Sequence, residues 1–376
     1  MIYLDNAATT YPKPEVVYKE LDKANRNAFN TGRGSYKVAR DASIIKENVR
    51  KKILELNNIN NANVVYTNSA TNALNDLIFG IELHKGDCVY VSPFEHNSII
   101  RPLEELKREK QINVKLLPFD KKTWELDIEK TKDLFVLDKP SAIFISQVSN
   151  VTGYILPYNK IFELAEQYNS INILDASQGY GIVKIPDYKN INYIVFAGHK
   201  SLYASFGIAG YLKLKNDELK PHIFGGTGSD TMNPNMPKMF PDGFEAGSPN
   251  IVAISSLNVS IDWLNEVDIY THEKKLTDYL IRELSKLKEI NVFIPEDISK
   301  IFGVVSFNVN NYTSEDVGKI LDEEFDICVR TGYHCAPLIH EFIGSIESGG
   351  TVRVGLNYFN TKEDIDTLIK AIKSLL

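Results

Sequence analysis

Short apolar runs that alternate with helix-like segments dominate the first two thirds of this 376-residue chain. The runs lie at residues 64–67, 88–91, 114–117, 142–145, 171–174, 193–196 and 208–212. Helical spacing appears in other segments, for example at Ile45, Val49, Ile53 and Leu56. This alternation predicts an α/β fold with a mostly parallel sheet covered on both faces, and such sheets bind ligands at the carboxyl ends of their strands.

The pattern changes near residue 254. A helix is predicted over 251–264 and an amphipathic one through Tyr279 and Leu287, followed by apolar runs at 303–308, 327–329 and 351–354. The sequence Thr361-Lys362-Glu363-Asp364 predicts a capping box that starts a last helix. We expect a large domain at 15–254, a smaller α+β domain at 255–376, and an N-terminal segment, 1–14, that packs with the smaller domain.

Composition excludes several classes of protein. Hydrophobic residues make up 43% of the chain and charged residues 24%, as in globular domains rather than disordered or membrane-spanning chains. A net charge of −7 argues against a general nucleic-acid surface. The three cysteines, Cys88, Cys328 and Cys335, are too few and too irregularly spaced for a disulfide framework or a zinc site. We therefore expect a cytoplasmic protein with no metal, no nucleic-acid partner and no membrane partner.

Two of the apolar runs lead into residues that can do chemistry. The run at 171–174 is followed by Asp175, and the run at 193–196 is followed, after Ala-Gly-His, by Lys200. A carboxylate that keeps a pyridine nitrogen protonated and a lysine that forms an imine are what pyridoxal phosphate requires of a protein. A lone lysine at a strand end is more often a solvated charge, but the pairing with Asp175 favours this cofactor.

Other segments can supply phosphate and ring contacts. Ser69, Ala70 and Thr71 lie between a strand and a helix, where backbone N–H groups and hydroxyls bind phosphate, although any helix start favours such residues. Thr227, in the glycine-rich stretch 225–228, is a second phosphate candidate or simply part of a flexible loop.

Two polar side chains that follow predicted strands can contact the ring of the cofactor. His96 can stack on it, and Gln178 can hydrogen-bond its phenolic oxygen. Taken singly, each is more often an incidental loop residue.

Cys335 follows a glycine, an aromatic residue and a histidine, with Arg330 five residues before it. Cysteine is usually a small buried hydrophobe, but nearby cationic groups favour the nucleophilic thiolate. Arg330 and Arg353 each lie in or at the end of a predicted strand, and arginine binds a carboxylate through two parallel hydrogen bonds. Either arginine can hold an amino-acid substrate, while surface arginine is the default interpretation.

Taken together, these motifs resemble the class V aminotransferase superfamily of fold-type I pyridoxal-phosphate enzymes. Within that superfamily, the chain is similar to the cysteine desulfurase and selenocysteine lyase group. The motifs that carry the resemblance run from end to end, at residues 3–10, 32–34, 95–97, 149–153, 175–178, 197–200, 244–250, 330–335 and 353–361. The compact cysteine loop resembles the short-loop branch of that group.

The resemblance implies a role for each matching residue. Lys200 would form the imine, Asp175 would pair with the pyridinium nitrogen, and Cys335 would receive sulfur as a persulfide. The remaining matches concern binding. The cofactor phosphate would be bound by Ser69, Ala70, Thr71 and His199, and the cofactor ring by His96 and Gln178. The substrate carboxylate would be bound by Asn150 and Arg353, with Arg330 lining the same pocket.

By the same resemblance, the expected activity is a pyridoxal 5'-phosphate-dependent cysteine desulfurase that forms L-alanine from L-cysteine, acts as a homodimer and passes sulfur to an acceptor protein. A selenocysteine lyase or another C–S or C–Se β-lyase is the alternative enzyme. A non-catalytic scaffold is the alternative of a different class. It predicts loss of the lysine, the acid or the cysteine, and all three are present.

The chain departs from the group at a few positions. Ala197 stands where a hydroxyl residue commonly precedes Gly-His-Lys, Asn72 where glutamate is frequent, and Tyr36 where histidine is common in the short-loop branch. None of these changes removes a group that imine chemistry requires.

Overall fold

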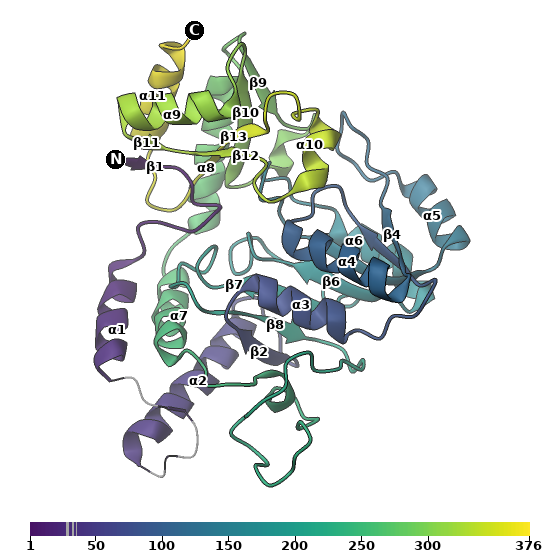
Figure 1. Cartoon of the computed structure of the whole chain (residues 1–376). Coiled ribbons are helices and arrows are strands. Elements are labelled where there is room, and N and C mark those ends of the chain that lie inside the picture. The colour runs from purple at the N-terminus through teal and green to yellow at the C-terminus, as the bar shows by residue number, and fades with distance from the viewer. Residues whose placement is uncertain (28–29, 32–33, 35) are drawn as a thin grey trace.

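A seven-stranded sheet forms the centre of the computed structural model, which describes residues 1–27, 30–31, 34 and 36–376 (Figure 1). The strand order is β2-β8-β7-β6-β5-β3-β4. Its strands are β2 (Asn63–Thr67), β3 (Cys88–Val91), β4 (Asn113–Leu116), β5 (Pro140–Ser146), β6 (Ile171–Asp175), β7 (Tyr193–Ala197) and β8 (Ala209–Lys213). The predicted runs match these bounds to within two residues at either end.

Most helices of the first two thirds of the chain flank this sheet, and the first of them packs against the last. In chain order, the helices are α1 (Glu15–Arg26), α2 (Lys37–Glu55), α3 (Ala70–Gly80), α4 (Asn97–Lys110), α5 (Ile128–Leu137), α6 (Tyr158–Ala165) and α7 (Ile251–Leu264). The predicted helix at 251–264 agrees with α7, and α2 carries the face predicted from Ile45, Val49 and Ile53. Of the predicted motif at 32–34, Gly32 and Arg33 lie outside the described residues.

The prediction of a mostly parallel sheet is confirmed, with two antiparallel exceptions. Strands β4, β3, β5, β6 and β7 pair in parallel, while β8 runs antiparallel to both β7 and β2. The short connection from β7 to β8 contains no helix, so the chain cannot cross over the sheet and must return in the opposite direction. Lys200 lies on this return connection.

Alternate residues of each strand enter two separate cores. Val65, Val195 and Tyr211 pack on one face with α3 and α4, whereas Ile194 and Phe196 pack on the other with α2, α6 and α7. Burial of both faces explains why the strands are continuous apolar runs rather than alternating patterns.

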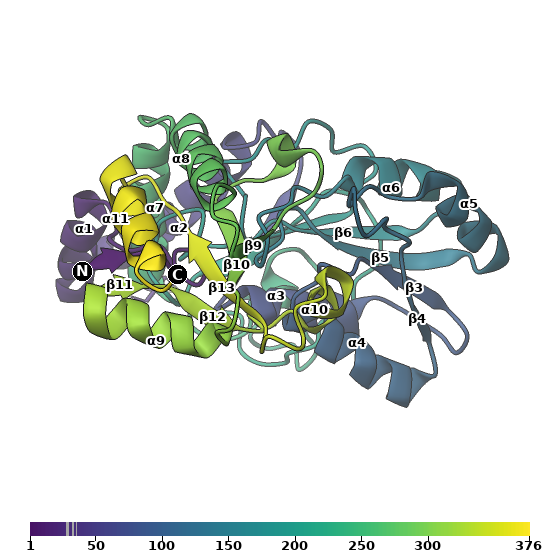
Figure 2. The same cartoon turned by 90° about the horizontal axis from the view of Figure 1, so that it is seen from above.

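The C-terminal part of the chain forms a second, antiparallel sheet of order β12-β13-β10-β9 (Figure 2). Its strands are β9 (Ile290–Phe293), β10 (Val304–Val309), β12 (Arg330–Gly332) and β13 (Thr351–Gly355). The helices of this part are α8 (Ile269–Leu284), α9 (Ser314–Phe325), α10 (Pro337–Ile343) and α11 (Lys362–Lys373). The capping box predicted at Thr361 is confirmed: its hydroxyl accepts from the Asp364 N–H, and the Asp364 carboxylate accepts from the Thr361 N–H.

The N-terminal segment joins the two parts. Strand β1 (Ile2–Tyr3) pairs with β11 (Ile327–Cys328), and the Asn6 side chain accepts a hydrogen bond from Asn357 Nδ2 at 2.8 Å. Further along, the Thr10 N–H donates to the His199 carbonyl at 3.2 Å. The segment thus reaches from the C-terminal sheet to the loop that carries Lys200, while the predicted domain boundaries stay a prediction. In the described ranges, no helix is long and apolar enough to cross a membrane.

The buried face of β7 provides a test of this packing. Ile194 is fully buried between the sheet and its covering helices, so Ile194→Ala should lower the free energy of unfolding by about 3 kcal/mol through lost contacts and a residual cavity. Val136→Ala, at a helix position that is 70% exposed, should change it by less than about 0.5 kcal/mol. Urea unfolding of both variants measures the difference, and equal midpoints would contradict the assignment of Ile194 to the core.

Candidate active site

The carboxyl ends of β6 and β7 bring Asp175 and the Lys200 loop together. These strands are parallel neighbours, with Asp175 opposite Val195, and Lys200 follows β7 by three residues. Asp175 is 7% exposed, and Lys200 is half-buried. The two residues that the sequence paired therefore lie at the same edge of the sheet.

Burial lowers the pKa of the Lys200 ammonium, and the positive charges of Arg353 and Arg330 lower it further. The nearby Asp175 carboxylate opposes this shift, as does Cys335 to a smaller extent. A depressed pKa increases the fraction of neutral amine, which is the form that acts as a nucleophile or a base.

Asp175 is held by its own loop. Both the Ser177 N–H, at 3.0 Å, and the Ser177 hydroxyl donate to Asp175 Oδ1. Among the described residues, no hydrogen bond is made to Asp175 Oδ2, which leaves that oxygen for a ligand. Sequence reasoning did not single out Ser177, although a hydroxyl two residues after an aspartate is a recognisable turn signal.

His96 caps the start of α4. Its Nδ1 accepts from the Ser98 N–H at 3.0 Å, which fixes the plane of the ring. Burial, followed by the charge of Lys200, lowers the pKa of His96 to about 3, so the imidazole is neutral at neutral pH. A neutral, oriented ring is suited to stacking on a flat aromatic ligand.

The residue before it, Glu95, is fully buried and was not predicted as part of the site. It accepts hydrogen bonds from the Ser146 N–H at 3.0 Å and the Ser146 hydroxyl at 2.6 Å. Ser146 pairs with Asp175 across β5 and β6, so Glu95 links the segment that carries His96 to the strand ends beneath the site.

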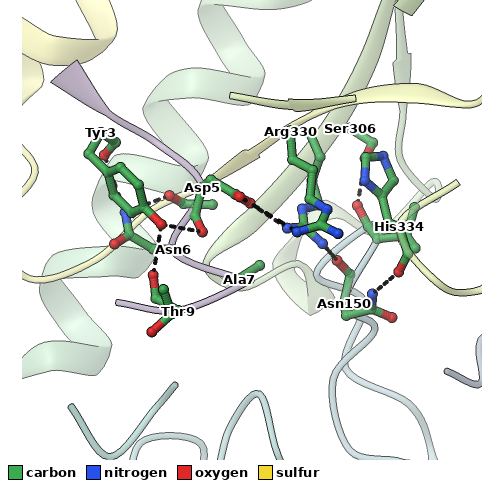
Figure 3. Close-up of polar contacts among 12 residues, drawn as sticks. Tyr3, Asp5, Asn6, Ala7, Thr9, Asn150, Ser306, Arg330 and His334 are labelled. Carbon is green, nitrogen blue, oxygen red and sulfur yellow. Dashed lines mark hydrogen bonds and ion pairs between the residues drawn. The ribbon is translucent and has the colours of Figure 1, made fainter. Parts of the chain in front are cut away.

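The cysteine loop lies directly beside His96. The Cys335 carbonyl accepts from the Asn97 N–H at 2.7 Å, and the preceding His334 carbonyl accepts from Asn150 Nδ2 at 2.8 Å (Figure 3). The His334 ring is buried, with Nε2 at 2.8 Å from Thr351 Oγ1, whereas Cys335 itself is exposed. Both residues have left-handed backbone angles, with φ of 48° and 56°, so two hydrogen bonds hold a strained turn that leaves the thiol exposed beside His96.

Two arginines face a carboxylate of the N-terminal segment. Arg353 donates from Nη2 to Asp5 Oδ1 at 2.6 Å and from Nη1 to the Asn150 carbonyl at 3.0 Å. Arg330 lies 3.8 Å from Asp5 Oδ2, and Figure 3 shows the Asp5 carboxylate pointing at it. The structure thus brings Asn150, Arg330 and Arg353 together, as the sequence predicted, and adds Asp5, which shows that these guanidinium groups can hold a carboxylate.

The predicted phosphate contacts lie at the start of α3. Ser69 caps this helix by accepting from the Asn72 N–H at 3.2 Å, while Ala70 and Thr71 form its first turn. The side-chain hydroxyl of Ser69 also donates to Asn72 Oδ1 at 2.6 Å, so Asn72 joins the cap.

The His199 ring stacks on Phe206 at 4.5 Å, and its Nδ1 is buried with no hydrogen-bond partner among the described residues. An orphaned buried nitrogen of this kind matches a polar group of a ligand.

Two residues that were predicted to contact the cofactor form hydrogen bonds within the protein instead. Gln178 Nε2 donates to the Ala7 carbonyl at 2.9 Å. Thr227 lies in the long loop between β8 and α7, where its hydroxyl is 3.1 Å from Ser229 Oγ. That loop lines a cavity of about 1310 Å³, which Thr67, Asn68 and Asn72 also border.

These observations fit pyridoxal phosphate. Lys200 supplies the amine, Asp175 Oδ2 an open acceptor, and His96 a flat neutral ring. The buried Nδ1 of His199 and the first turn of α3 supply polar groups for a phosphate.

Comparisons with known proteins agree with this arrangement. The family model for aminotransferase class-V matches residues 2–368. A probable cysteine desulfurase from Methanothermobacter thermautotrophicus is 32% identical, with 100% of this chain and 94% of that protein covered.

Two solved structures are also similar. The apo cysteine desulfurase from Thermococcus onnurineus NA1 has a TM-score of 0.90 and 26% identity, covering 100% of this chain and 94% of the other. The cysteine desulfurase CsdA from Escherichia coli has a TM-score of 0.82 and 25% identity, covering 99% and 94%. Since the family model spans nearly the whole sequence and the fold agrees over the same length, the chain belongs to the class-V aminotransferase family.

Proposed function

We propose that this protein is a pyridoxal-phosphate-dependent cysteine desulfurase that converts L-cysteine into L-alanine and carries the sulfur on Cys335 as a persulfide. The observation that carries the proposal is the hydrogen bond from the Asn97 N–H to the Cys335 carbonyl at 2.7 Å. It holds an exposed thiol next to His96, at the edge of the site formed by Lys200 and Asp175.

Lys200 would hold the cofactor through its amine, and Asp175 would keep a proton on the pyridine nitrogen. The other contacts would come from His96 and Gln178 around the ring and from Ser69, Ala70, Thr71, His199 and Thr227 around the phosphate. When bound, pyridoxal phosphate supplies an electron-poor ring that accepts the charge left after the substrate Cα loses its proton.

The substrate carboxylate would take the place of Asp5 in front of Arg353 and Arg330, with Asn150 beside them. In that position the Cα proton would face the Lys200 amine, which would act as the base. Burial and the nearby arginines lower the pKa of this amine and so favour its neutral, basic form. The protonated amine would hold this proton while the sulfur is removed and supply it when the substrate carbon is protonated.

Cys335 acts last. Its thiolate attacks the substrate sulfur, so that an S–S bond forms while the substrate Cβ–S bond breaks and its electron pair passes to the carbon framework. Protonation of that carbon gives alanine, and the enzyme keeps the sulfur as Cys335–S–SH. The main contribution of the protein to this step is to position the thiol, which the two tethers of the cysteine loop provide.

Selenocysteine has the same carboxylate and amine as cysteine, so the protein groups that bind them do not discriminate between the two substrates. A sulfur-acceptor protein and a cytoplasmic location stay predictions.

Exposed apolar side chains on the long loop after β8 support a homodimer. Ile223, Phe224, Met232 and Met239 are 50%, 71%, 94% and 77% exposed, and this loop projects beside α2 in Figure 1. Clusters of exposed apolar residues usually mark protein interfaces. A second copy would cover these side chains and bring Thr227 to the phosphate site of its partner.

Sedimentation should therefore give the mass of two chains. Replacing Phe224 and Met232 by aspartate should shift the protein to one chain, because two carboxylates would be buried in the interface. Val136→Asp, at an exposed site on α5, is the control. A monomeric parent protein would reject the dimer.

Lys200 can be tested by colour and by trapping. The protein supplied with pyridoxal phosphate should be yellow, and borohydride should fix a cofactor adduct on the peptide that contains Lys200. Lys200→Ala should lose the adduct, while Lys220→Ala, at an exposed ion pair, should keep it. An adduct on another lysine, or a parent protein that takes up no cofactor, would favour the scaffold alternative.

Cys335 can be tested by product analysis with L-cysteine and L-selenocysteine in parallel. Cys335→Ala should lower alanine formation from cysteine at least ~100-fold without changing cofactor absorbance, because the variant lacks the group that takes the sulfur. Cys328→Ala, at the half-buried cysteine of β11, should leave the rate unchanged. Undiminished activity of Cys335→Ala on cysteine would exclude the persulfide route, and activity of the parent protein on selenocysteine alone would identify a selenocysteine lyase.

A further inference from the structure

Tyr203 has an unusual conformation, three residues after Lys200. Its backbone is left-handed, with φ of 54°, and its side chain is fully buried. Few bulky residues adopt this angle, and those that do are held by their surroundings, often at functional sites.

Tyr203 connects the Lys200 turn to the C-terminal part of the chain. Its N–H donates to the Lys200 carbonyl at 2.9 Å. Its hydroxyl donates to Glu273 Oε1 on α8 at 2.8 Å and accepts from the Tyr358 N–H at 2.9 Å. One side chain thus spans the distance between the lysine loop and two segments of the C-terminal part.

Glu273 is a buried acid for which the proposed mechanism has no use. It is 4% exposed, and Tyr203 is its only side-chain hydrogen-bond partner among the described residues. Its other oxygen, Oε2, lies close to Gly303, so that a side chain at position 303 would place its Cβ atom 3.3 Å from this oxygen. Burial raises the pKa of Glu273 to about 8, against the opposing effect of the Tyr203 hydrogen bond. At neutral pH the carboxyl is therefore protonated.

A small cavity borders both Glu273 and the Lys200 turn. Its volume is about 30 Å³, and its lining includes Lys200, Tyr203, Glu273 and Gln178. A cavity needs roughly 10–15 Å³ to hold a water molecule, so one water fits and can accept the proton of the carboxyl.

We propose that Tyr203 and Glu273 are positioning residues for Lys200: the hydrogen bond from the tyrosine hydroxyl to the Glu273 carboxyl fixes the lysine turn against α8. The proposal rests on the role given above to Lys200. Loss of the carboxyl proton leaves a buried charge that desolvation destabilises, although the hydrogen bond from the tyrosine hydroxyl favours the charged form.

Among the residues that the structure describes, none forms an ion pair with Glu273, although Lys200 borders the same cavity. Lys200 and Tyr203 face it from the turn, Tyr358 lies beyond the tyrosine hydroxyl, and the neighbouring His272 donates to or accepts from the Asn360 carbonyl at 2.9 Å. The N-terminal segment and the start of β10 contribute only non-ionisable residues to the cavity lining.

The first test measures urea unfolding of the cofactor-free protein against pH. The folded state keeps a proton on Glu273 that the unfolded state loses near the usual carboxyl pKa. Stability from this group therefore falls as pH rises from about 4.5 to 8. Glu273→Gln mimics the protonated carboxyl, so its unfolding midpoint relative to the parent should rise across that window, by roughly 0.5 M urea. Identical pH profiles of the two proteins would overturn the proposal.

The second test uses the cofactor-loaded protein and titrates its visible absorbance, which reports the proton on the Lys200 nitrogen. Tyr203→Phe should shift the midpoint by at least about 0.5 pH unit, because the turn loses its anchor. The matched control is Tyr193→Phe, which breaks a tyrosine–carboxylate hydrogen bond to Asp217 at the other end of β7 and should leave the midpoint unchanged. Glu273→Gln keeps an acceptor for the tyrosine hydroxyl, so the midpoint of its absorbance titration should equal that of the parent.

The two tests separate the two proposals. If the parent protein takes up no pyridoxal phosphate, the proposed function fails, and the unfolding experiment still tests the Tyr203–Glu273 contact. If Tyr203→Phe and Tyr193→Phe have the same midpoint as the parent, the contact does not position Lys200. If Tyr203→Phe fails to fold, the proposal is tested by the first experiment alone, which compares the pH dependence of urea unfolding in Glu273→Gln and in the parent.

Discussion

The parallel pairing of β6 with β7 is the constraint on which the site depends. It places Asp175 and the Lys200 loop at one edge of the sheet, and hydrogen bonds link the segment of His96 to the same strand ends and to the cysteine loop. The pairing is stable because both faces of the two strands are buried, by α3 and α4 on one side and by α2, α6 and α7 on the other. The chemistry of the site is thus supported by two strands whose residues are almost all buried.

The N-terminal segment contacts the candidate site residues from the side of the C-terminal part. Asp5 faces Arg353, the Ala7 carbonyl accepts from Gln178, and Thr10 contacts the loop of Lys200. A single short stretch therefore touches candidate residues that lie far apart in the sequence. That stretch also pairs with β11. Movement of the C-terminal part relative to the central sheet would therefore change the contacts of this stretch with Arg353 and with the Lys200 loop.

Sequence reasoning succeeded where a local pattern carried the information. The strands of the central sheet are continuous apolar runs, and Asp175 and Lys200 each follow such a run. Cys335 follows the apolar run at 327–329 within a recognisable motif. Sequence reasoning missed β9 and β12, which are short edge strands with few buried residues. It also missed the contacts of Asp5 with Arg353 and of Tyr203 with Glu273. These partners are distant in the chain, and only the packing of the C-terminal part on the sheet brings them together.

The left-handed turn at His334 and Cys335 has a consequence for how the thiol works. Each non-glycine residue in this conformation costs about 1–2 kcal/mol, and here the tethers to Asn150 and Asn97 offset that cost during folding. In the proposed reaction, the sulfur would therefore be attached to a turn that two hydrogen bonds hold in place. An acceptor would have to approach the exposed Cys335 side chain, because the backbone of this turn is bonded to the rest of the protein.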